Sequence, residues 1–441
     1  MLNDHKLSMS EVRTLSLASI GGALEFYDFI IFVFLAQVIG KLFFSSAAAD
    51  WLRQAQVFGI FSAGYLARPI GGIVMAHFGD TRGRKRVFML SVLLMAIPTF
   101  LIGILPTYRS IGIAAPLLLL LLRILQGVAI GGEAPGAWIF VAEHARQGRV
   151  GFAIGWLTCG LSFGVLLGSL MSTCLNRIFS SAQVAAGAWR IPFLVGGVFG
   201  LIAMWLRRWL AETPVFEELR RRAALSRQLP LRVVLKDHMQ AVITSILSTW
   251  VLTAAIVVVI LMTPVLLPQL FGVAPFQAQL ASLLGTAALC IATVVVGSAT
   301  DRFGIIRVAV PMFLLLIAST YMLYRIAASE PMMHAGTGPR LLIPLYVLAG
   351  FGAGAVVITP ILMIRSFPAA VRFSGVSFSY NLGYALFGGV TPLLISLLVH
   401  VDRLAPAYYV AAVAVIGLGA TIMATTYELS DVDSTAVARS A

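Results

Sequence analysis

The sequence predicts an all-α polytopic membrane protein, with twelve transmembrane helices in two six-helix halves. The first observation is composition, since 59% of the 441 residues are hydrophobic and only 11% are charged. An ordinary soluble domain has about 25% charged residues, so lipid is expected to face most of this surface. The second is a series of apolar runs of about 20 residues or more, the length that crosses a bilayer. The third is one long polar stretch that divides the series in two.

Twelve apolar runs are long enough to span a membrane. The second run is the least hydrophobic and the tenth merges with its flanks, so eleven spans is the alternative count. The runs cover residues 15–44, 54–78, 87–106, 111–141, 150–175, 189–210, 239–264, 277–300, 305–327, 340–365, 373–400 and 406–427.

The polar stretch at residues 211–238 organises the chain. It predicts a first six-helix half at 1–210, a cytoplasmic linker, and a second half at 239–441 that ends in a short tail. Charged residues between Glu217 and Arg222 predict a surface helix within this linker. Basic residues concentrate in the loops on the linker's side, and this bias marks the cytoplasmic face. Both termini are therefore expected in the cytoplasm, with the chain in a cell (inner) membrane.

The basic charge does not point to nucleic acid. The net charge is +13, but the Lys and Arg residues form short clusters between apolar runs. A nucleic-acid reader needs them on a broad solvated face. The lipid bilayer is therefore the predicted partner, and no nucleic acid is expected.

No cofactor, metal or catalytic centre is expected. The sequence has no GxxxxGK[ST] string and no soluble domain large enough for a nucleotide, which argues against a pump driven by nucleotide hydrolysis. The six histidines are scattered over loops and span ends. The three cysteines, Cys159, Cys174 and Cys290, lie in or beside apolar runs without metal-ligand spacing, which predicts small buried residues. The sequence therefore predicts a protein that is not an enzyme.

Two loops at the same place in the two halves share a pattern. The loop after the second run reads GDTRGRKR at 79–86, and the loop after the eighth reads TDRFGIIR at 300–307. Each contains an aspartate, an arginine, a glycine that permits a tight turn, and then a basic residue. Two six-span halves related by such a repeat are typical of transporters.

These loops are the candidate cytoplasmic gate, because charge bias alone would not require the aspartate and the glycine. We expect Asp80 to accept hydrogen bonds from backbone N–H groups at a neighbouring helix start. We expect the basic cluster to pair with acids such as Glu143 when the cytoplasmic side is closed. The gate residues are Gly79, Asp80, Arg82, Gly83, Arg84, Lys85, Glu143, Arg146, Asp301, Arg302 and Arg372.

At these residues the sequence resembles the major facilitator superfamily. More narrowly it resembles the metabolite:proton symporter family, which includes carriers of citrate, α-ketoglutarate, shikimate and proline/betaine. The order and spacing of several strings over nearly the whole chain carry the resemblance. They are GGALEFYDF at 21–29 (the family has GNxxEWYDF), RPIGG at 68–72 before GDTRGRK at 79–85, RILQG at 123–127 before GGE at 131–133, WRIPF at 189–193 before ETP at 212–214, and RFSG at 372–375 before YNLG at 380–383 and GGVTP at 388–392.

The resemblance implies a secondary transporter of the superfamily fold, a monomer that moves a small polar metabolite with protons. The chain departs from the family in a few places. Gly22 and Phe26 replace the usual Asn and Trp, and Thr81 replaces the usual Arg of the first gate loop. Ile305 and Ile306 stand where basic residues are common, which weakens the second gate loop.

Carboxylates inside apolar runs are costly and therefore mark candidate function. Glu25 and Asp28 are three residues apart and share one helix face, where two carboxylates repel in a low dielectric. One of them is expected to hold a proton near neutral pH and release it when water arrives. The alternative is that one carboxylate permanently neutralises a basic partner. Glu133, beside several glycines, is either a further protonation site or a structural contact. The candidate proton-coupling residues are thus Glu25, Asp28 and Glu133.

Polar side chains in the fourth and eleventh runs are candidates for substrate binding. Arg123 and Gln126 share a helix face, and the guanidinium suits a carboxylate. Arg123 is expected to anchor a substrate carboxylate or to tune Asp28, with a structural salt bridge as the alternative. Asn381 needs a partner in hydrocarbon, and is expected either to bind substrate or to bridge helices. The candidate substrate-binding residues are Tyr27, Arg123, Gln126, Tyr380, Asn381 and Tyr384.

Taken together, the patterns predict a secondary active transporter that moves a small organic acid or related polar metabolite with protons by alternating access. The intramembrane carboxylates favour proton coupling but do not fix its direction. Proton-coupled uptake of an osmolyte such as betaine or proline, and an exporter or uniporter of the same fold, are the alternatives. A carrier-like sensor is less favoured, because the tail after Tyr427 is short. No cofactor is expected, since a proton gradient supplies the driving force.

Overall fold

The structure is a computed structural model that describes residues 9–146, 148–209, 214–221, 230–329 and 337–440. Within these ranges the regular elements are helices and no strand occurs, which confirms the predicted all-α class. The chain separates into two compact units, Met1–His144 with Gly160–Ala223 (unit 1) and Ala145–Cys159 with Ala224–Ala441 (unit 2).

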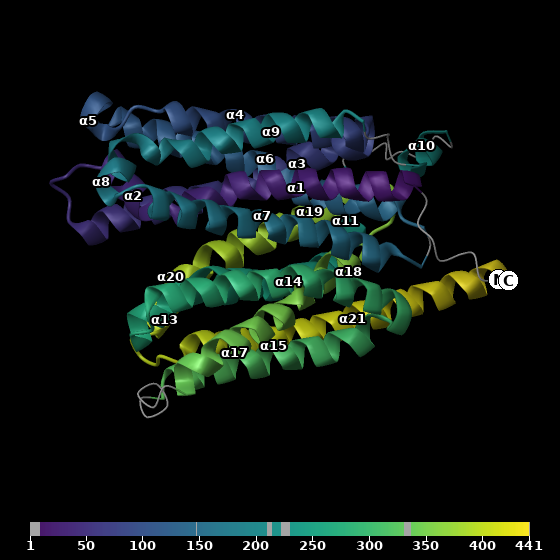
Figure 1. Cartoon of the computed structure of the whole chain (residues 1–441). Helices are drawn as coiled ribbons and strands as arrows, with labels where there is room; N and C mark the ends of the chain where they lie inside the picture. Colours follow the sequence, from purple (N-terminus) through teal and green to yellow (C-terminus); the bar gives the residue numbers. More distant parts are fainter. Residues whose placement is uncertain (1–8, 147, 210–213, 222–229, 330–336, 441) are drawn as a thin grey trace. The chain divides into compact units, whose positions relative to one another are not determined.

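Unit 1 is a helical bundle, drawn mostly in purple, blue and teal in Figure 1. It holds the second part of α7 (Val150–Ile178), the helix in which the chain passes from one unit to the other. Its other elements are α1 (Met9–Phe34), α2 (Ala36–Phe43), α3 (Asp50–Arg82), α4 (Arg84–Ile104), α5 (Tyr108–Ile111), α6 (Ala114–His144), α8 (Ser181–Gln183), the π-helical turn η1 (Val184–Ala188), α9 (Arg190–Arg207) and α10 (Pro214–Arg221).

Unit 2 is a second helical bundle, which includes the first part of α7. Its other elements are α11 (Pro230–Asp237), α12 (Met239–Thr253), η2 (Ala254–Met262), α13 (Thr263–Phe271), α14 (Pro275–Phe303), α15 (Ile305–Ala327), α17 (Thr337–Ala353), η3 (Gly354–Val357), α18 (Ile358–Ser366), α19 (Arg372–Gly383), η4 (Tyr384–Gly388), α20 (Gly389–Leu398) and α21 (Ala405–Ser440).

The spans agree with the sequence pattern in number. Among the described residues, eleven helices are long and apolar enough to cross a membrane, and a bent pair makes a twelfth. The pair is Ser181–Ala188 with Arg190–Leu206, and the helix direction bends by 49° between them. The first predicted run, 15–44, is divided at Leu35 into α1 and α2. The predicted linker helix is present as α10, while Arg222 lies outside the described residues.

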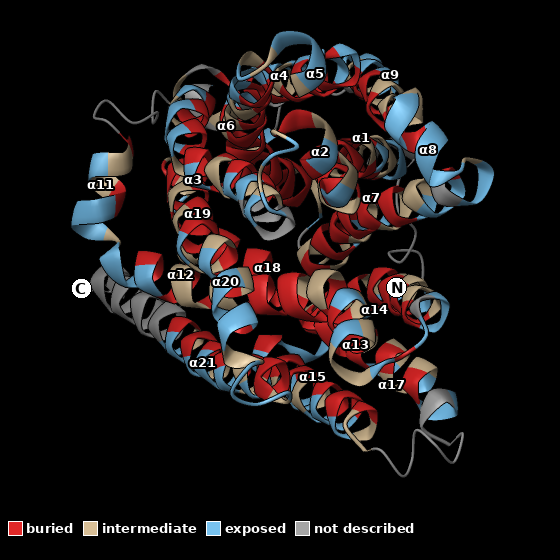
Figure 2. Ribbon diagram, turned by 90° about the vertical axis from the view of Figure 1, so that its left-hand side faces the viewer, coloured by how far each residue is buried: buried red, intermediate tan, exposed pale blue. Residues whose placement is uncertain are grey.

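Close contact between α3 and α6 positions the polar residues of unit 1. A Cβ at Gly127 or Gly131 of α6 would collide with the carbonyl oxygen of Gly64 or Arg68 on α3. Small residues four apart let two helix backbones approach in this way. The second half of α6 is consequently buried along nearly its whole length (Figure 2). Its polar residues therefore lie inside the bundle.

The two repeated loops are single-glycine turns. Gly83 joins α3 to α4 with a φ of 112°, and Gly304 joins α14 to α15 with a φ of 85°. These left-handed conformations favour glycine, because a side chain would clash with the backbone there. The tight turns predicted at the glycines of the two repeated loops are thus present in both units.

Candidate functional site

Four helices of unit 1 bring polar side chains to one place in its interior. Helices α1 and α4 pack against each other and against both α6 and α9 (Figure 1). They contribute Asp28 from α1, Thr99 from α4, and Arg123 and Gln126 from α6, each with 0% of its surface exposed. We call these four residues the polar centre. The face of α6 that carries Arg123 and Gln126 thus points into the bundle.

Arg123 lies in an aromatic cage. Its guanidinium carbon is 4.7 Å from the ring centroid of Phe29, 4.3 Å from that of Phe32 and 5.6 Å from that of Phe61. The rings' negative faces attract the cation, and this attraction is stronger where water is excluded. Within the described part of the chain, Nε and Nη2 make no hydrogen bond. The cage therefore holds the charge in place and leaves two donor groups for another acceptor.

A chain of hydrogen bonds links Arg123 to α4. Arg123 Nη1 donates to Gln126 Oε1 at 2.7 Å, and Gln126 Nε2 donates to Thr99 Oγ1 at 2.7 Å. Thr99 in turn donates to the Met95 carbonyl at 2.9 Å. Every bond is buried, so each fixes the orientation of its neighbour. Gln126 therefore orients the guanidinium, and Thr99 orients Gln126.

Asp28 lies beside this chain without a basic partner. Within the described residues, neither carboxyl oxygen has a hydrogen-bond partner, and no ion pair to Asp28 occurs. The carboxyl packs against α9, where a Cβ at Gly196 would collide with Oδ1 and would lie 2.9 Å from Thr99 Cγ2. The alternative is that a basic residue permanently neutralises one of the two carboxylates. For Asp28, no such basic partner occurs among the described residues. An isolated carboxylate in such a site carries a large desolvation penalty.

The other predicted residues of the first and fourth runs are buried but differ in their surroundings. Glu25 is 1% exposed and Glu133 is 2% exposed. Glu133 lies next to Gly132, which packs against the Met75 side chain of α3, away from the Thr99 end of α6. The Tyr27 hydroxyl donates to the Pro192 carbonyl at 2.9 Å and so ties α1 to α9. Tyr27 therefore has a structural contact in addition to its predicted role.

Sequence reasoning missed Thr99 and the glycines of α9. Thr99 is a single hydroxyl in an apolar run, and such residues commonly bond only to their own helix. Gly196 and Gly200 had a signal, since they are four residues apart and small pairs at this spacing mark helix contacts. The pattern does not say that the contact is with a carboxylate.

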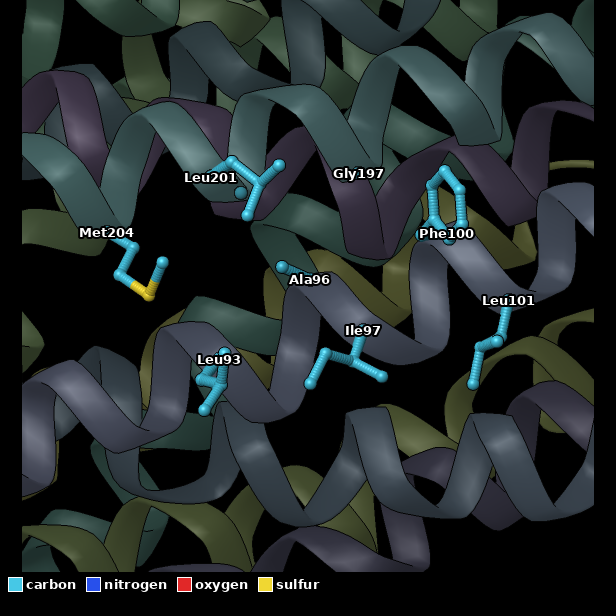
Figure 3. A pocket seen from close by; sticks show the side chains of 9 residues that line it. Leu93, Ala96, Ile97, Phe100, Leu101, Gly197, Leu201 and Met204 are labelled. Carbon is cyan, nitrogen blue, oxygen red and sulfur yellow. The ribbon is translucent and has the colours of Figure 1, made fainter.

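An apolar groove lies on the other side of the α9 glycines. Figure 3 shows side chains of α4 and α9 around it, and its volume is about 230 Å³. Gly200 lines it, and a Cβ at Gly200 would also lie 3.7 Å from Asp28 Oδ2. The lining side chains offer only carbon and sulfur, so the groove does not suit a polar ligand. They are Leu93, Ala96, Ile97, Phe100, Leu101, Gly197, Gly200, Leu201 and Met204.

The candidate residues of unit 2 lie on α19 and in the π-helical turn η4. Tyr380, Asn381 and Tyr384 are buried, and the two tyrosine rings are 4.8 Å apart. Asn381 Nδ2 donates to the Ser377 carbonyl of its own helix at 2.7 Å. Insertions of a π-helical turn are frequent at functional sites. Whether these side chains contact a substrate stays a prediction.

An aromatic cluster stands beside the same π-helical turn. Trp250 of α12 stacks on Phe387 with centroids 4.2 Å apart and 3° between planes. Its indole N–H donates to the Tyr409 hydroxyl at 2.8 Å, and Tyr409 and Thr391 share a hydrogen bond of 2.6 Å. The cluster thus joins α12, α20 and α21 across η4.

The second gate loop makes a contact of the kind expected for the first. Asp301 Oδ1 accepts from the Gly151 N–H and Oδ2 from the Phe152 N–H, both at 2.7 Å. These N–H groups open α7, so the carboxylate caps the positive end of a helix. The charges of Arg149 and Arg365 act on the same carboxylate. Asp301 thus fixes the start of α7 within unit 2.

The remaining gate residues divide by burial. Gly79, Asp80, Gly83 and Glu143 are buried, whereas Arg146 and Arg302 are exposed. The side chains of Arg82 and Arg84 lie outside the described part of the chain. Lys85 Nζ donates to the Arg208 carbonyl at 3.4 Å, and Arg372 Nε donates to the Phe367 carbonyl at 3.2 Å. The expected pairing of the basic cluster with Glu143 stays a prediction.

In the part of the chain that the structure describes, no three His, Cys, Asp or Glu side chains come together as metal ligands. The residues that meet in unit 1 suit protons and carboxylates instead, because they combine a carboxyl, a caged guanidinium and an amide.

The membrane spans and the buried polar centre define a multi-pass membrane transporter. The family model of the Major Facilitator Superfamily matches residues 18–269, which is more than half of the chain. The chain therefore belongs to the Major Facilitator Superfamily, and it is a transporter rather than an enzyme.

Individual relatives and structures agree with this family. The chain is 32% identical over 403 residues to the citrate-proton symporter of Klebsiella pneumoniae, covering 91% of this chain and 89% of that protein. It is 31% identical to the proline/betaine transporter of Salmonella typhimurium, covering 95% and 83%. A solved structure of the proton:xylose symporter XylE has the same fold, with a TM-score of 0.76, 16% identity, and coverage of 95% and 96%.

Proposed function

We propose that this transporter moves a small organic acid, or a related polar metabolite, together with protons by alternating access. The observation that carries the proposal is Asp28, a fully buried carboxyl with no hydrogen-bond or ionic partner among the described residues. It lies at the same α9 glycine as Thr99, which belongs to the hydrogen-bond chain that orients Arg123. Two relatives at about one-third identity, named as a citrate-proton symporter and a proline/betaine transporter, support the same class.

The proton coupling follows from the surroundings of Asp28. The neutral acid fits the site, since nothing stabilises a negative charge there and a buried ion costs several kcal/mol. When the transporter opens and water reaches the site, the carboxylate becomes stable and the proton leaves. Asp28 thus carries a proton across the membrane: it is protonated in the closed site and deprotonated after the site opens to water.

The substrate would be held by Arg123. Its Nε and Nη2 groups supply donors in the planar arrangement that a carboxylate accepts. Gln126 and Thr99 keep the guanidinium oriented. Once Asp28 has lost its proton, its carboxylate competes for the same cation, and this competition favours substrate release. Proton transfer and substrate release are coupled in this way.

The rest of the proposal concerns the organisation of the protein. Two six-helix halves, 1–210 and 239–441, move about the linker at 211–238. The two gate loops close the cytoplasmic side. The protein acts as a monomer in a cell (inner) membrane with both termini in the cytoplasm. The proton gradient drives transport, and no cofactor takes part.

The test is uptake by the purified chain in proteoliposomes with an imposed pH gradient. Radiolabelled citrate, succinate, proline and glycine betaine are the probes, and a trapped dye reports internal pH. We expect an organic acid to accumulate only when the outside is more acidic, with acidification of the lumen. Accumulation of betaine or proline alone would establish the osmolyte alternative. Uptake that ignores the gradient and a protonophore would establish a uniporter and end the proton-coupling proposal.

A further inference from the structure

Two cysteines of unit 2 meet where α7 and α14 touch. Along α7, a Cβ at Gly151 or Gly155 would collide with the carbonyl oxygen of Gly297 or Thr293 of α14. The next position on the same face of α7 is Cys159, four residues after Gly155. Cys290 lies three residues before Thr293 on α14, so the antiparallel register brings it next to Cys159, and the two thiols influence each other electrostatically. The pair thus continues the line of contact that the glycines begin.

The two thiols are reduced and differ in access. Both cysteines are free, with Cys159 partly exposed and Cys290 buried. The third cysteine, Cys174, is exposed, so the buried position predicted for it is wrong. It lies about 22 Å further along α7 at the helical rise and cannot reach either of the other two. The small apolar role expected from the sequence does not explain why two thiols face each other.

The helices are close enough for a covalent link. At Gly155 the Val294 Cα lies 3.3 Å from the position of a Cβ, so the backbones are nearly in contact. Disulfides join Cα atoms about 4.4–6.8 Å apart. Cys159 and Cys290 lie one turn further along the same line of contact, so side-chain rotation is expected to bring the sulfurs to bonding distance without moving the helices far.

We propose that Cys159 and Cys290 form a site of reversible oxidation to a disulfide by a small hydroperoxide. The more accessible Cys159 thiolate attacks the peroxide oxygen, which gives a sulfenic acid and releases hydroxide. Cys290 then attacks the Cys159 sulfur and expels the sulfenic oxygen as water. Overall, two thiols and one hydrogen peroxide give one disulfide and two waters, so the sulfurs are oxidised and the peroxide is reduced.

The disulfide would join the two halves proposed to move during transport, because Cys159 lies in 1–210 and Cys290 in 239–441. In the structure, Ala145–Cys159 packs with unit 2 and Gly160–Ala223 packs with unit 1. A bond to Cys290 fixes this end of unit 2's segment of α7 to α14. The proposed transport cycle requires the halves to move, so oxidation is expected to inhibit uptake and reduction to restore it. Only this inhibition rests on the proposed function, because the disulfide itself is a property of the folded chain.

The experiment counts reactive thiols in the full-length protein, in membranes, before and after brief treatment with hydrogen peroxide. After denaturation, a maleimide carrying a polyethylene glycol chain labels each free cysteine and shifts the band on a non-reducing gel. Cys159→Ser and Cys290→Ser remove the pair, and Cys174→Ser is the matched control on the same helix. Uptake of the substrate found in proteoliposomes is measured on the same samples, with and without dithiothreitol.

The native chain is expected to fall from three labelled thiols to one, and to recover three with dithiothreitol. Cys174→Ser should fall from two to none, while Cys159→Ser and Cys290→Ser should keep both thiols and keep uptake. The disulfide site would be overturned if the native chain kept three labelled thiols after oxidation. It would also be overturned if Cys159→Ser lost two labelled thiols, as the native chain is expected to do. A disulfide that forms without loss of uptake would overturn the inhibition. An absence of uptake in every reduced sample would instead count against the proposed function.

Discussion

Replacement of Thr99 by valine tests whether the hydrogen-bond chain holds Arg123 in its working position. Valine has nearly the same shape as threonine, so the packing of α4 against α9 is retained. The hydroxyl is lost, however, and with it the acceptor for Gln126 Nε2 at 2.7 Å. The change therefore removes one link of the chain and adds no bulk.

The size of the effect follows from burial. Gln126 has 0% of its surface exposed, so no water can replace the lost acceptor. A buried donor left without a partner costs about 1–3 kcal/mol. If Gln126 turns to find another acceptor, it releases Arg123 Nη1, and the site loses its orientation. At about 1.4 kcal/mol for each tenfold change, apparent affinity in uptake is expected to fall about 5- to 150-fold.

The assay is the concentration dependence of uptake in proteoliposomes, with protein amount matched by quantitative blotting. Thr99→Ser keeps the hydroxyl and should stay within about threefold of the native chain, well under 1 kcal/mol. Thr421→Val is the matched control, since Thr421 is equally buried and its hydroxyl donates to the Gly417 carbonyl of its own helix. Native affinity in Thr99→Val would refute the reasoning, as would Thr99→Ser behaving like Thr99→Val.

Three further predictions use the same preparations. Arg123→Lys should lower uptake of carboxylates at least about tenfold, because lysine lacks the planar donor pair; unchanged uptake and affinity would remove Arg123 from the site. Gly131→Leu should force α3 and α6 apart and so abolish folded protein in detergent, measured as the yield on size-exclusion chromatography. Gly389→Ala is the control, because Gly389 has open space around it, and it should give a normal yield. Equal yields of the two variants would contradict the close packing of α3 against α6. Asp301→Ala should lower the free energy of unfolding by about 1–2 kcal/mol through loss of the α7 cap, seen as a lower melting temperature, and an unchanged melting temperature would show that the cap adds no stability.

The fold was accessible from the sequence because the bilayer imposes a length and a polarity on every span. The runs, the turn glycines Gly83 and Gly304, and the surface helix at α10 all follow from local rules. The division of the first run at Leu35 and the 49° bend of the sixth do not. They depend on how neighbouring helices pack, which no local pattern records.

The candidate site was accessible only in part, for a related reason. Charges inside apolar runs identified Asp28 and Arg123, because each must have a purpose to offset its cost. The sequence could not say that the arginine is caged by three phenylalanines instead of being paired with the aspartate. Nor could it connect Thr99 to Gln126, since they are 27 residues apart and meet only once α4 and α6 are packed. Contacts between helices carry this information, and a single sequence does not display them.

The most direct test of the account is Asp28→Asn in proteoliposomes, measured in two modes. In the first, substrate is driven by a pH gradient; in the second, labelled substrate outside exchanges with unlabelled substrate inside at equal pH. Asparagine stays neutral, as the protonated acid is, so exchange should continue while gradient-driven accumulation is lost. Glu25→Gln, one turn away on the same face, is the matched comparison. If Asp28→Asn still accumulates substrate against its gradient as the native chain does, Asp28 does not couple the proton.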